Sequence, residues 1–238
     1  QTPAEMDEFD SWIQNGVLPA WLAPLAHRHP LPFQVDEGAG GPVHLSTYHG
    51  DSFSLGVASR QLEAQDIIFI ALQSNVCIAH FQRPDTPRPG VLFTRYLLDD
   101  KWIGSFRTTP SREADQLLPE EGRFWGVQNG GRAIGLYAPR QLNGFNRCAS
   151  AKAVVAWTQR EHVDEIWIGD TKIDALPAQV PPGEVVVIAS GGVYSAVLPL
   201  SLTDLGGAEI RLADIDGFLV LEMYNYRGPA KTFWELAH

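Results

Sequence analysis

The sequence predicts an all-β protein, a multi-strand antiparallel β-sandwich (supersandwich) behind a short N-terminal helical segment. The first observation is a succession of short runs rich in Val, Ile, Phe, Tyr and Thr between residues 50 and 226, separated by turn residues. The second is their short spacing, because parallel strands need crossovers of a dozen residues or more. The third is that runs such as IIFIAL and VVVIA are apolar on both faces, which favours stacked layers.

The chain is expected to divide into two units. In the first, residues 1–41, a capping-box pattern at Thr2 and Glu5 begins an amphipathic helix. A stretch rich in Pro and Gly, residues 27–41, is predicted to be a connector. The apolar face of the helix then needs either the β-domain or a helical neighbour to cover it. Residues 42–238 form the predicted β-sandwich domain.

Turn residues join several predicted strands into hairpins, for example at Asn129-Gly130-Gly131 and at Gly191-Gly192. Residues 83–90 and 104–122 are predicted to be loops. The predicted strands are residues 44–48, 52–58, 66–72, 76–82, 91–98, 123–128, 132–138, 151–158, 165–169, 185–190, 193–199, 209–212 and 218–226.

Length and composition exclude some classes of function. A chain of 238 residues suits one large β-domain, since sandwiches and barrels often reach this size as single units. The net charge of −10 and the scattered Lys and Arg residues argue against nucleic acid as a partner, because its phosphates would be repelled. No apolar run has the roughly 18–20 residues that span a bilayer. Cys77 and Cys148 lack metal-ligand spacing, and the sequence leaves a disulfide between them open.

Several catalytic motifs are absent from the sequence. It contains no G-x-S-x-G nucleophile elbow, no P-loop, no G-x-G-x-x-G after a strand and no H-E-x-x-H. These absences argue against a self-contained hydrolase, kinase or dehydrogenase of the familiar types.

Tyr48 and His49 are the candidate catalytic residues. A phenol and an imidazole side by side at the end of a strand can exchange protons with a substrate. The alternative is that Tyr48 is an aromatic core residue beside a surface turn.

Four further residues are candidates for substrate binding. Arg60 follows an apolar strand and could bind a carboxylate through two parallel hydrogen bonds from its guanidinium. The alternative is a solvated charge at the end of a strand. Trp125, Gln128 and Asn129 lie near a hairpin tip, where an indole could stack on a sugar ring and the amides could bind hydroxyls. The alternative for Trp125 is a place in the core.

A cupin-like metal site is a further alternative, with His44 and His49 as ligands. These two residues are five apart, which places them on opposite faces of a regular strand. The carboxylate and the later histidine that such a site needs are not convincingly placed, so we expect no metal and no cofactor.

The order of the strands carries a resemblance to a known family. The runs HLSTY (44–48), FSLGVASR (53–60) and QDIIF (65–69), and later GFLVLEM (217–223) with TFW (232–234), are the residues concerned. They resemble the opening and closing strands of the β-sandwich that follows an (α/α) toroid in heparinase II/III-like polysaccharide lyases and related glycoside-hydrolase-like proteins.

The resemblance implies a carbohydrate ligand and a helical partner. The N-terminal helix and residues 19–33 would be the end of a toroid, which supplies most of the catalytic cleft in that family and is not in this sequence. Such lyases use Tyr and His for proton transfer and Arg with Asn or Gln against the uronate carboxylate. Tyr48 and His49 have suitable chemistry, but they do not align with the family's catalytic pair. The leading hypothesis is the sandwich half of a carbohydrate-active protein, and the alternative is a stand-alone lectin-like module.

Overall fold

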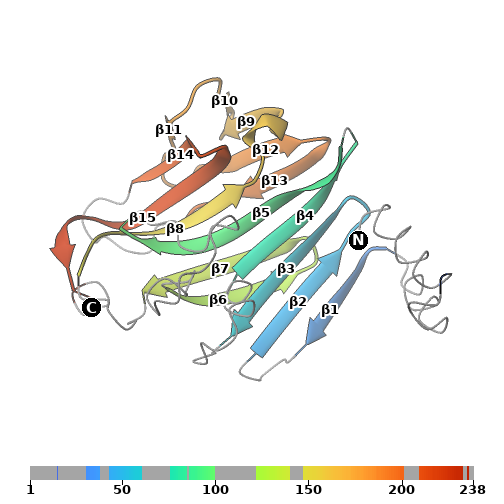
Figure 1. The fold of residues 1–238 in the computed structure, drawn as a ribbon, viewed down its shortest axis with the longest axis horizontal. Helices are drawn as coiled ribbons and strands as arrows, with labels where there is room; N and C mark the ends of the chain where they lie inside the picture. Colours follow the sequence, from blue (N-terminus) through green and yellow to red (C-terminus); the bar gives the residue numbers. More distant parts are fainter. Residues whose placement is uncertain are drawn as a thin grey trace.

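The structure is a computed structural model, and it confirms an all-β fold built from antiparallel sheets (Figure 1). A nine-stranded sheet has the order β1-β2-β3-β4-β5-β8-β15-β14-β11, a four-stranded sheet has the order β10-β9-β12-β13, and β6 pairs with β7. The structure describes residues 15, 31–37, 43–60, 76–84, 86–99, 122–139, 147–200, 209–232 and 235. Among these residues no helix is long and apolar enough to cross a membrane.

The described elements follow one another along the chain with mostly short connections. Their bounds are β1 Phe33–Glu37, β2 Val43–His49, β3 Phe53–Arg60, β4 Val76–Arg83, β5 Thr86–Leu98, β6 Gly122–Asn129, β7 Arg132–Pro139, β8 Cys148–Trp157, the 3-10 turn η2 Arg160–His162, β9 Glu165–Ile168, β10 Thr171–Lys172, β11 Ala178–Gln179, β12 Val186–Ser190, β13 Val193–Val197, β14 Ile210–Ile215 and β15 Phe218–Lys231.

The nine-stranded sheet has two faces because successive side chains on a strand point to opposite sides. One face, here called the sandwich face, carries Leu92, Trp157 and Leu219 in one row across β5, β8 and β15. These side chains are buried against Ile166 and Ile188 of the four-stranded sheet. Burying a side chain of this size stabilises the fold by roughly 1.5–3 kcal/mol. The other face, here called the second face, carries a separate cluster of buried side chains: Phe93, Leu97, Val154, Ala156 and Val220.

The β6–β7 hairpin covers another part of the sandwich face. The Tyr137 hydroxyl lies 2.8 Å from Oγ1 of Thr94 on β5, next to the ring of Phe124. At the hairpin tip, the Gly130 N–H donates to Oε1 of Gln34 on β1 over 2.7 Å. The hairpin therefore reaches from β5 to β1, and the four-stranded sheet and the hairpin together make the second layer of the sandwich (Figure 1).

The sheet begins before the predicted domain boundary. Phe33–Glu37 lies in the predicted connector, yet it forms β1 and pairs antiparallel with β2. Its alternating FQVDE pattern is a strand pattern, but prolines and glycines on both sides in the sequence concealed it. Similarly, β5 begins at Thr86 inside the predicted loop 83–90, because the β4–β5 hairpin turns tightly and pairs Arg83 with Thr86.

Most other predicted strands are present with bounds within a few residues. The hairpins predicted at residues 129–131 and 191–192 are confirmed as β6–β7 and β12–β13. The N-terminal helix, the predicted strand 66–72 and nearly all of the predicted loop 104–122 lie outside the described residues.

Candidate functional site

Tyr48 and His49 lie on opposite faces of the nine-stranded sheet. They are neighbours on β2, opposite Leu55 and Ser54 of β3. The Tyr48 ring packs on Phe53 with their centroids 5.6 Å apart. His49 packs on Phe33 at 4.8 Å, on the other side of the sheet. The structure therefore does not bring the phenol and the imidazole together at one point.

His49 contacts the Ser54 hydroxyl on the second face. Its Nδ1 atom lies 2.9 Å from Oγ of Ser54 on the neighbouring strand. Partial burial lowers the pKa of His49 below its usual 6.5. The ring is consequently neutral at physiological pH, and it can accept or donate one hydrogen bond at each nitrogen.

The predicted substrate-binding residues are spread over two strands and two faces. Arg60 ends β3, with its backbone opposite Val43. Gln128 points inward and donates from Nε2 to the Leu55 carbonyl over 2.7 Å and to the Gly130 carbonyl over 3.1 Å, so it anchors the hairpin. Asn129 is exposed at the hairpin tip.

Trp125 is exposed rather than in the core. It lies on the outward face of the hairpin, opposite Leu136 on β7, and the two side chains are 46% and 44% exposed. Val127 and Ile134 form the next pair along the hairpin and are also exposed. Four apolar side chains thus share one outward face, which we call the hairpin face.

The structure gives the cupin hypothesis no further support. His44 and His49 lie on opposite faces of β2, as their spacing predicted. Within the described part of the chain, no three His, Cys, Asp or Glu side chains are grouped as metal ligands would be. Cys77 and Cys148 are not joined by a disulfide.

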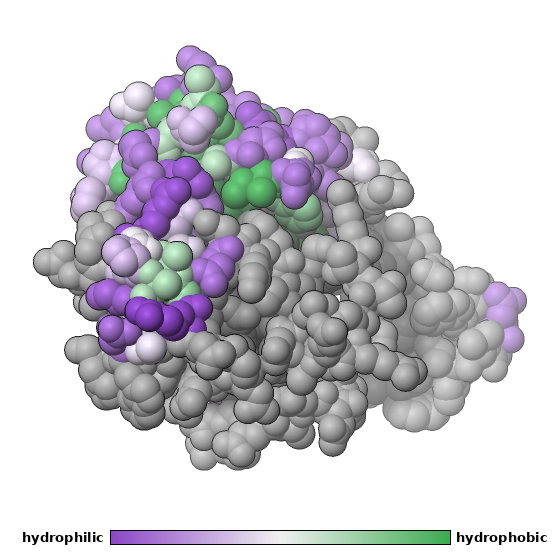
Figure 2. Space-filling view, turned by 60° about the vertical axis from the view of Figure 1, so that its left-hand side comes forward, coloured by the Kyte–Doolittle hydropathy of each residue, from purple (hydrophilic) through white to green (hydrophobic). Residues whose placement is uncertain are grey.

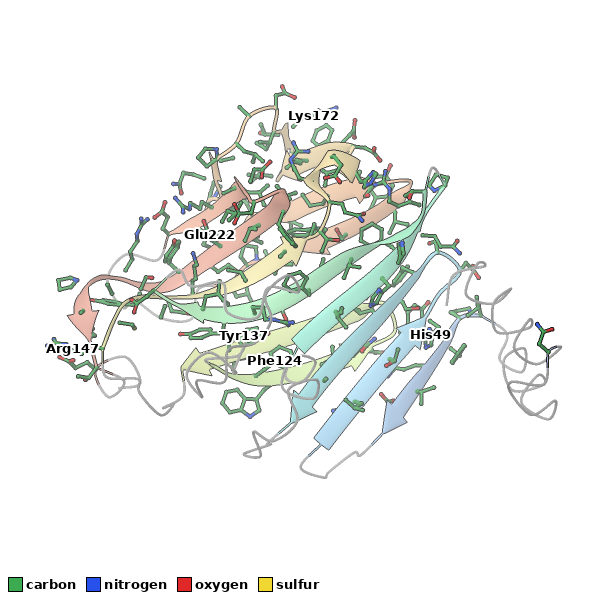
Figure 3. The ribbon with its side chains drawn as sticks, viewed as in Figure 1. His49, Phe124, Tyr137, Arg147, Lys172 and Glu222 are labelled. Atoms are coloured by element: carbon green, nitrogen blue, oxygen red, sulfur yellow. The ribbon has the colours of Figure 1, made fainter. Side chains whose placement is uncertain are left out.

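A different set of residues converges on the second face, and we call it the charge cluster. It consists of Lys152 on β8, Arg211 on β14, and Glu222 and Tyr224 on β15 (Figure 3 labels Glu222). Strand register explains the convergence, because Arg211 pairs directly with Glu222, and Lys152 pairs directly with Tyr224. Glu222 and Tyr224 are two residues apart on one strand, so both pairs share a face.

Glu222 is the centre of the charge cluster. One of its carboxylate oxygens accepts from Lys152 Nζ and the other accepts from Arg211 Nε. The Tyr224 hydroxyl lies 3.2 Å from Lys152 Nζ and 3.5 Å from Glu222 Oε1. The ion pair with Glu222 raises the pKa of Arg211. The carboxylate is therefore shared by two cations inside a nearly solvent-free environment.

Polar side chains with access to solvent form the rim of the charge cluster. Arg211 and Arg227 are 28% and 50% exposed, and their guanidinium carbons lie 5.8 and 5.1 Å from the centre of the Tyr224 ring. Arg227 binds Glu209 over 2.9 Å, and Glu209 also accepts from Gln179 over 2.9 Å. The hydrogen bond from Gln179, with that from Arg227, lowers the pKa of Glu209.

The chemistry of the rim is that of a polar ligand site. Guanidinium groups bind carboxylate or sulfate groups through two parallel hydrogen bonds, and amide and carboxylate side chains bind hydroxyls. The buried residues beneath fix the positions of the exposed ones, which is what a preorganised site needs. The buried phenol, ammonium and carboxylate are also a set that can exchange a proton.

The charge cluster had a signal in the sequence. Lys152 interrupts the apolar run CASAKAVVAW, and Glu222 interrupts FLVLEMY. A charged residue in the middle of a run that is apolar on both faces must be buried with a partner. Only the strand pairing, however, shows that these two charges meet.

In comparisons with protein-family models, curated proteins and solved structures, no significant match to this chain was found. The fold and the site together define an all-β antiparallel sandwich protein with a largely buried charge cluster on the second face of its large sheet.

Proposed function

We propose that this chain is the β-sandwich part of a carbohydrate-active protein of the polysaccharide lyase or glycoside hydrolase type. In this proposal the rim of the charge cluster lines the substrate cleft, and a helical partner domain or subunit completes it. The observation that carries the proposal is the fixed arrangement of four side chains that reach solvent over a buried ionic base: the partly exposed Arg211 and Glu209 and the exposed Arg227 and Gln179.

The rim favours an acidic polysaccharide as the substrate. Arg211 and Arg227 each use one N–H group in an ion pair with a glutamate, and both reach solvent. Their other N–H groups can bind a sugar carboxylate, while Glu209 and Gln179 can bind sugar hydroxyls. The side chains of Lys152 and Glu222 are only 2% and 1% exposed, so their role is to position the rim.

The helical partner is proposed from two features. The resemblance of the strand order is to sandwiches that follow a toroid, and the hairpin face leaves Val127 and Ile134 61% and 67% exposed. A row of exposed apolar side chains is typical of a surface that contacts another domain. We expect mass spectrometry of the protein from its native source to find a longer chain or a second, helical subunit. A native chain that begins at residue 1 and purifies without a helical subunit would contradict this part of the proposal.

Affinity electrophoresis in gels containing polygalacturonate tests the role of the rim. We expect Arg227→Gln to weaken binding about ten- to a hundredfold, since a charge-assisted hydrogen bond contributes about 1.5–3 kcal/mol. Arg132→Gln is the matched control, because Arg132 is an exposed arginine at the hairpin tip, away from the rim. Equal retardation of wild type and Arg227→Gln would contradict the proposal.

A stand-alone carbohydrate-binding module is the second candidate, and exposed Trp125 is the observation that favours it. An indole on a flat strand surface can stack on the apolar face of a sugar ring. We expect Trp125→Ala to abolish retention on a glycan array and Trp125→Phe to keep part of it. Leu136→Ala is the control, because it removes a similar exposed apolar area without an aromatic face. Equal losses in the two alanine variants would indicate a protein contact at the hairpin face.

A further inference from the structure

We propose that the outward face of the four-stranded sheet is a second polysaccharide-binding surface, on which Trp167 and Tyr194 stack against the sugar rings of a neutral polysaccharide. It lies on the other side of the nine-stranded sheet from the charge cluster. The inference does not depend on the function proposed for that cluster.

Strand alternation places both aromatic residues on the outward face. On β9, Ile166 and Ile168 point into the core, so Trp167 between them points outward. On β13, Ser195 points inward and accepts a hydrogen bond from Trp157 Nε1 over 2.8 Å. Its neighbour Tyr194 therefore points outward, and its side chain is 71% exposed.

The spacing of the two rings suits an extended sugar chain. Trp167 pairs with Val187 on β12, and Tyr194 pairs with Ala189 two residues further along the same strand. Two strand separations and a two-residue offset place the Trp167 and Tyr194 Cα atoms about 11–12 Å apart. The accessible floor between them is made of two small side chains, Val187 and Ala196, which lie in one row with Trp167, whereas Ala189 opposite Tyr194 is buried. Sugar rings can therefore lie flat over Val187 and Ala196 and against the two aromatic residues.

Two charged neighbours hold Trp167 in place. Its Nε1 atom donates to Glu165 Oε2 over 3.3 Å, and Lys172 Nζ lies 5.9 Å from the ring centre. Lys172 also binds Glu165 Oε1 over 2.7 Å (Figure 3 labels Lys172 on the small sheet). A side chain that is fixed in advance loses less entropy when a ligand binds.

The charge at this surface favours a neutral polysaccharide over an acidic one. Glu165 and Lys172 compensate each other, and the chain as a whole carries a net charge of −10. A polyanion therefore meets no uncompensated cation among the described residues of this face. A neutral sugar offers an apolar C–H face to the rings and hydroxyls to the remaining hydrogen-bonding capacity of Glu165 and Lys172.

Affinity electrophoresis of the full chain with hydroxyethylcellulose as a neutral probe tests the inference. We expect Tyr194→Ala and Trp167→Ala each to weaken retardation about tenfold, which corresponds to the loss of about 1.4 kcal/mol. Tyr194→Phe should bind as wild type does, because it keeps the ring. Leu200→Ala is the matched control, since Leu200 is an exposed apolar side chain without an aromatic face.

The outcomes separate this inference from the proposed function. Wild type that is not retarded by hydroxyethylcellulose overturns the inference, and so does wild-type behaviour of Tyr194→Ala. Neither result bears on the charge cluster, which is tested by Arg227→Gln with polygalacturonate. Binding of polygalacturonate that depends on Tyr194 and not on Arg227 would overturn both the neutral ligand proposed here and the role proposed for the rim.

Discussion

Lys152 on β8 and Glu222 on β15 form an ion pair in which the two side chains are 2% and 1% exposed. The two strands are antiparallel neighbours, and Glu222 also binds Arg211 on β14. Removing charges from water is costly, so a buried carboxylate persists only when cations and hydrogen bonds compensate it. Glu222 thus links three strands of the nine-stranded sheet, and it supports the exposed rim at the same time.

Glu222→Gln is expected to destabilise the protein by about 3–5 kcal/mol, because it removes the charge that Lys152 and Arg211 share. Urea denaturation followed by far-UV circular dichroism measures this change. Glu165→Gln is the matched control, since its pair with Lys172 is exposed and exposed pairs contribute about 0–1 kcal/mol. A similar small loss in both variants would mean that the charge cluster does not stabilise the sheet.

Strand alternation made the fold readable from the sequence. The strands β12, β13 and β15 could be predicted because each is a run of apolar residues next to a glycine turn. The strand β1 was missed because its alternation covers only Phe33–Glu37 among prolines and glycines. Its position in the sheet depends on antiparallel pairing with β2. The residue pattern of Phe33–Glu37 alone does not predict which strand it pairs with.

The candidate site was less readable for a related reason. Tyr48 and His49 are adjacent in the sequence, but adjacency on a strand sends side chains to opposite faces. Lys152 and Glu222 are far apart in the sequence, and register alone brings them together. A period-2 pattern can identify a buried charge, but it cannot say which other strand carries the partner.

Gly126→Ala is expected to loosen the hairpin and destabilise the protein by about 1–3 kcal/mol, the usual cost of overpacking. A Cβ atom there would lie 2.3 Å from Cγ1 of Val57 and 2.7 Å from the Phe124 ring. Gly56→Ala on β3, next to Val57, is the control, because the nearest atom to the added Cβ would be 3.7 Å away. We expect the control to be neutral or slightly stabilising in thermal denaturation. Equal melting temperatures for the two variants would show that the hairpin is not packed as described.

The two thiols should resist alkylation in the folded protein. Cys77 is partly buried, and this burial raises its pKa to about 12, while Cys148 is buried. Since the thiolate is the reactive form, iodoacetamide at about pH 8 should modify neither residue within the time that modifies both in urea. Mass spectrometry of the intact protein counts the added groups. Rapid labelling of Cys77 without denaturant would contradict its raised pKa.

His49 should make stability depend on pH below neutrality. Burial lowers the pKa of His49 in the folded state, whereas the unfolded chain keeps the usual value of 6.5. Between these two values the unfolded state binds more protons, so the free energy of unfolding rises with pH. The stabilising effect of a neutral His49 is therefore complete above 6.5 and is lost as the pH falls through the folded-state pKa.

His49→Gln separates this effect from the titration of carboxylates, because glutamine cannot take up a proton and can still hydrogen-bond Ser54. Urea unfolding at a series of pH values below 6.5 measures the slope for both proteins. We expect the variant to lose less stability than wild type over this range and to match it more closely at lower pH than at neutral pH. Parallel curves would mean that His49 has the same pKa in the folded and unfolded states, and that its ring is not buried between Phe33 and Ser54.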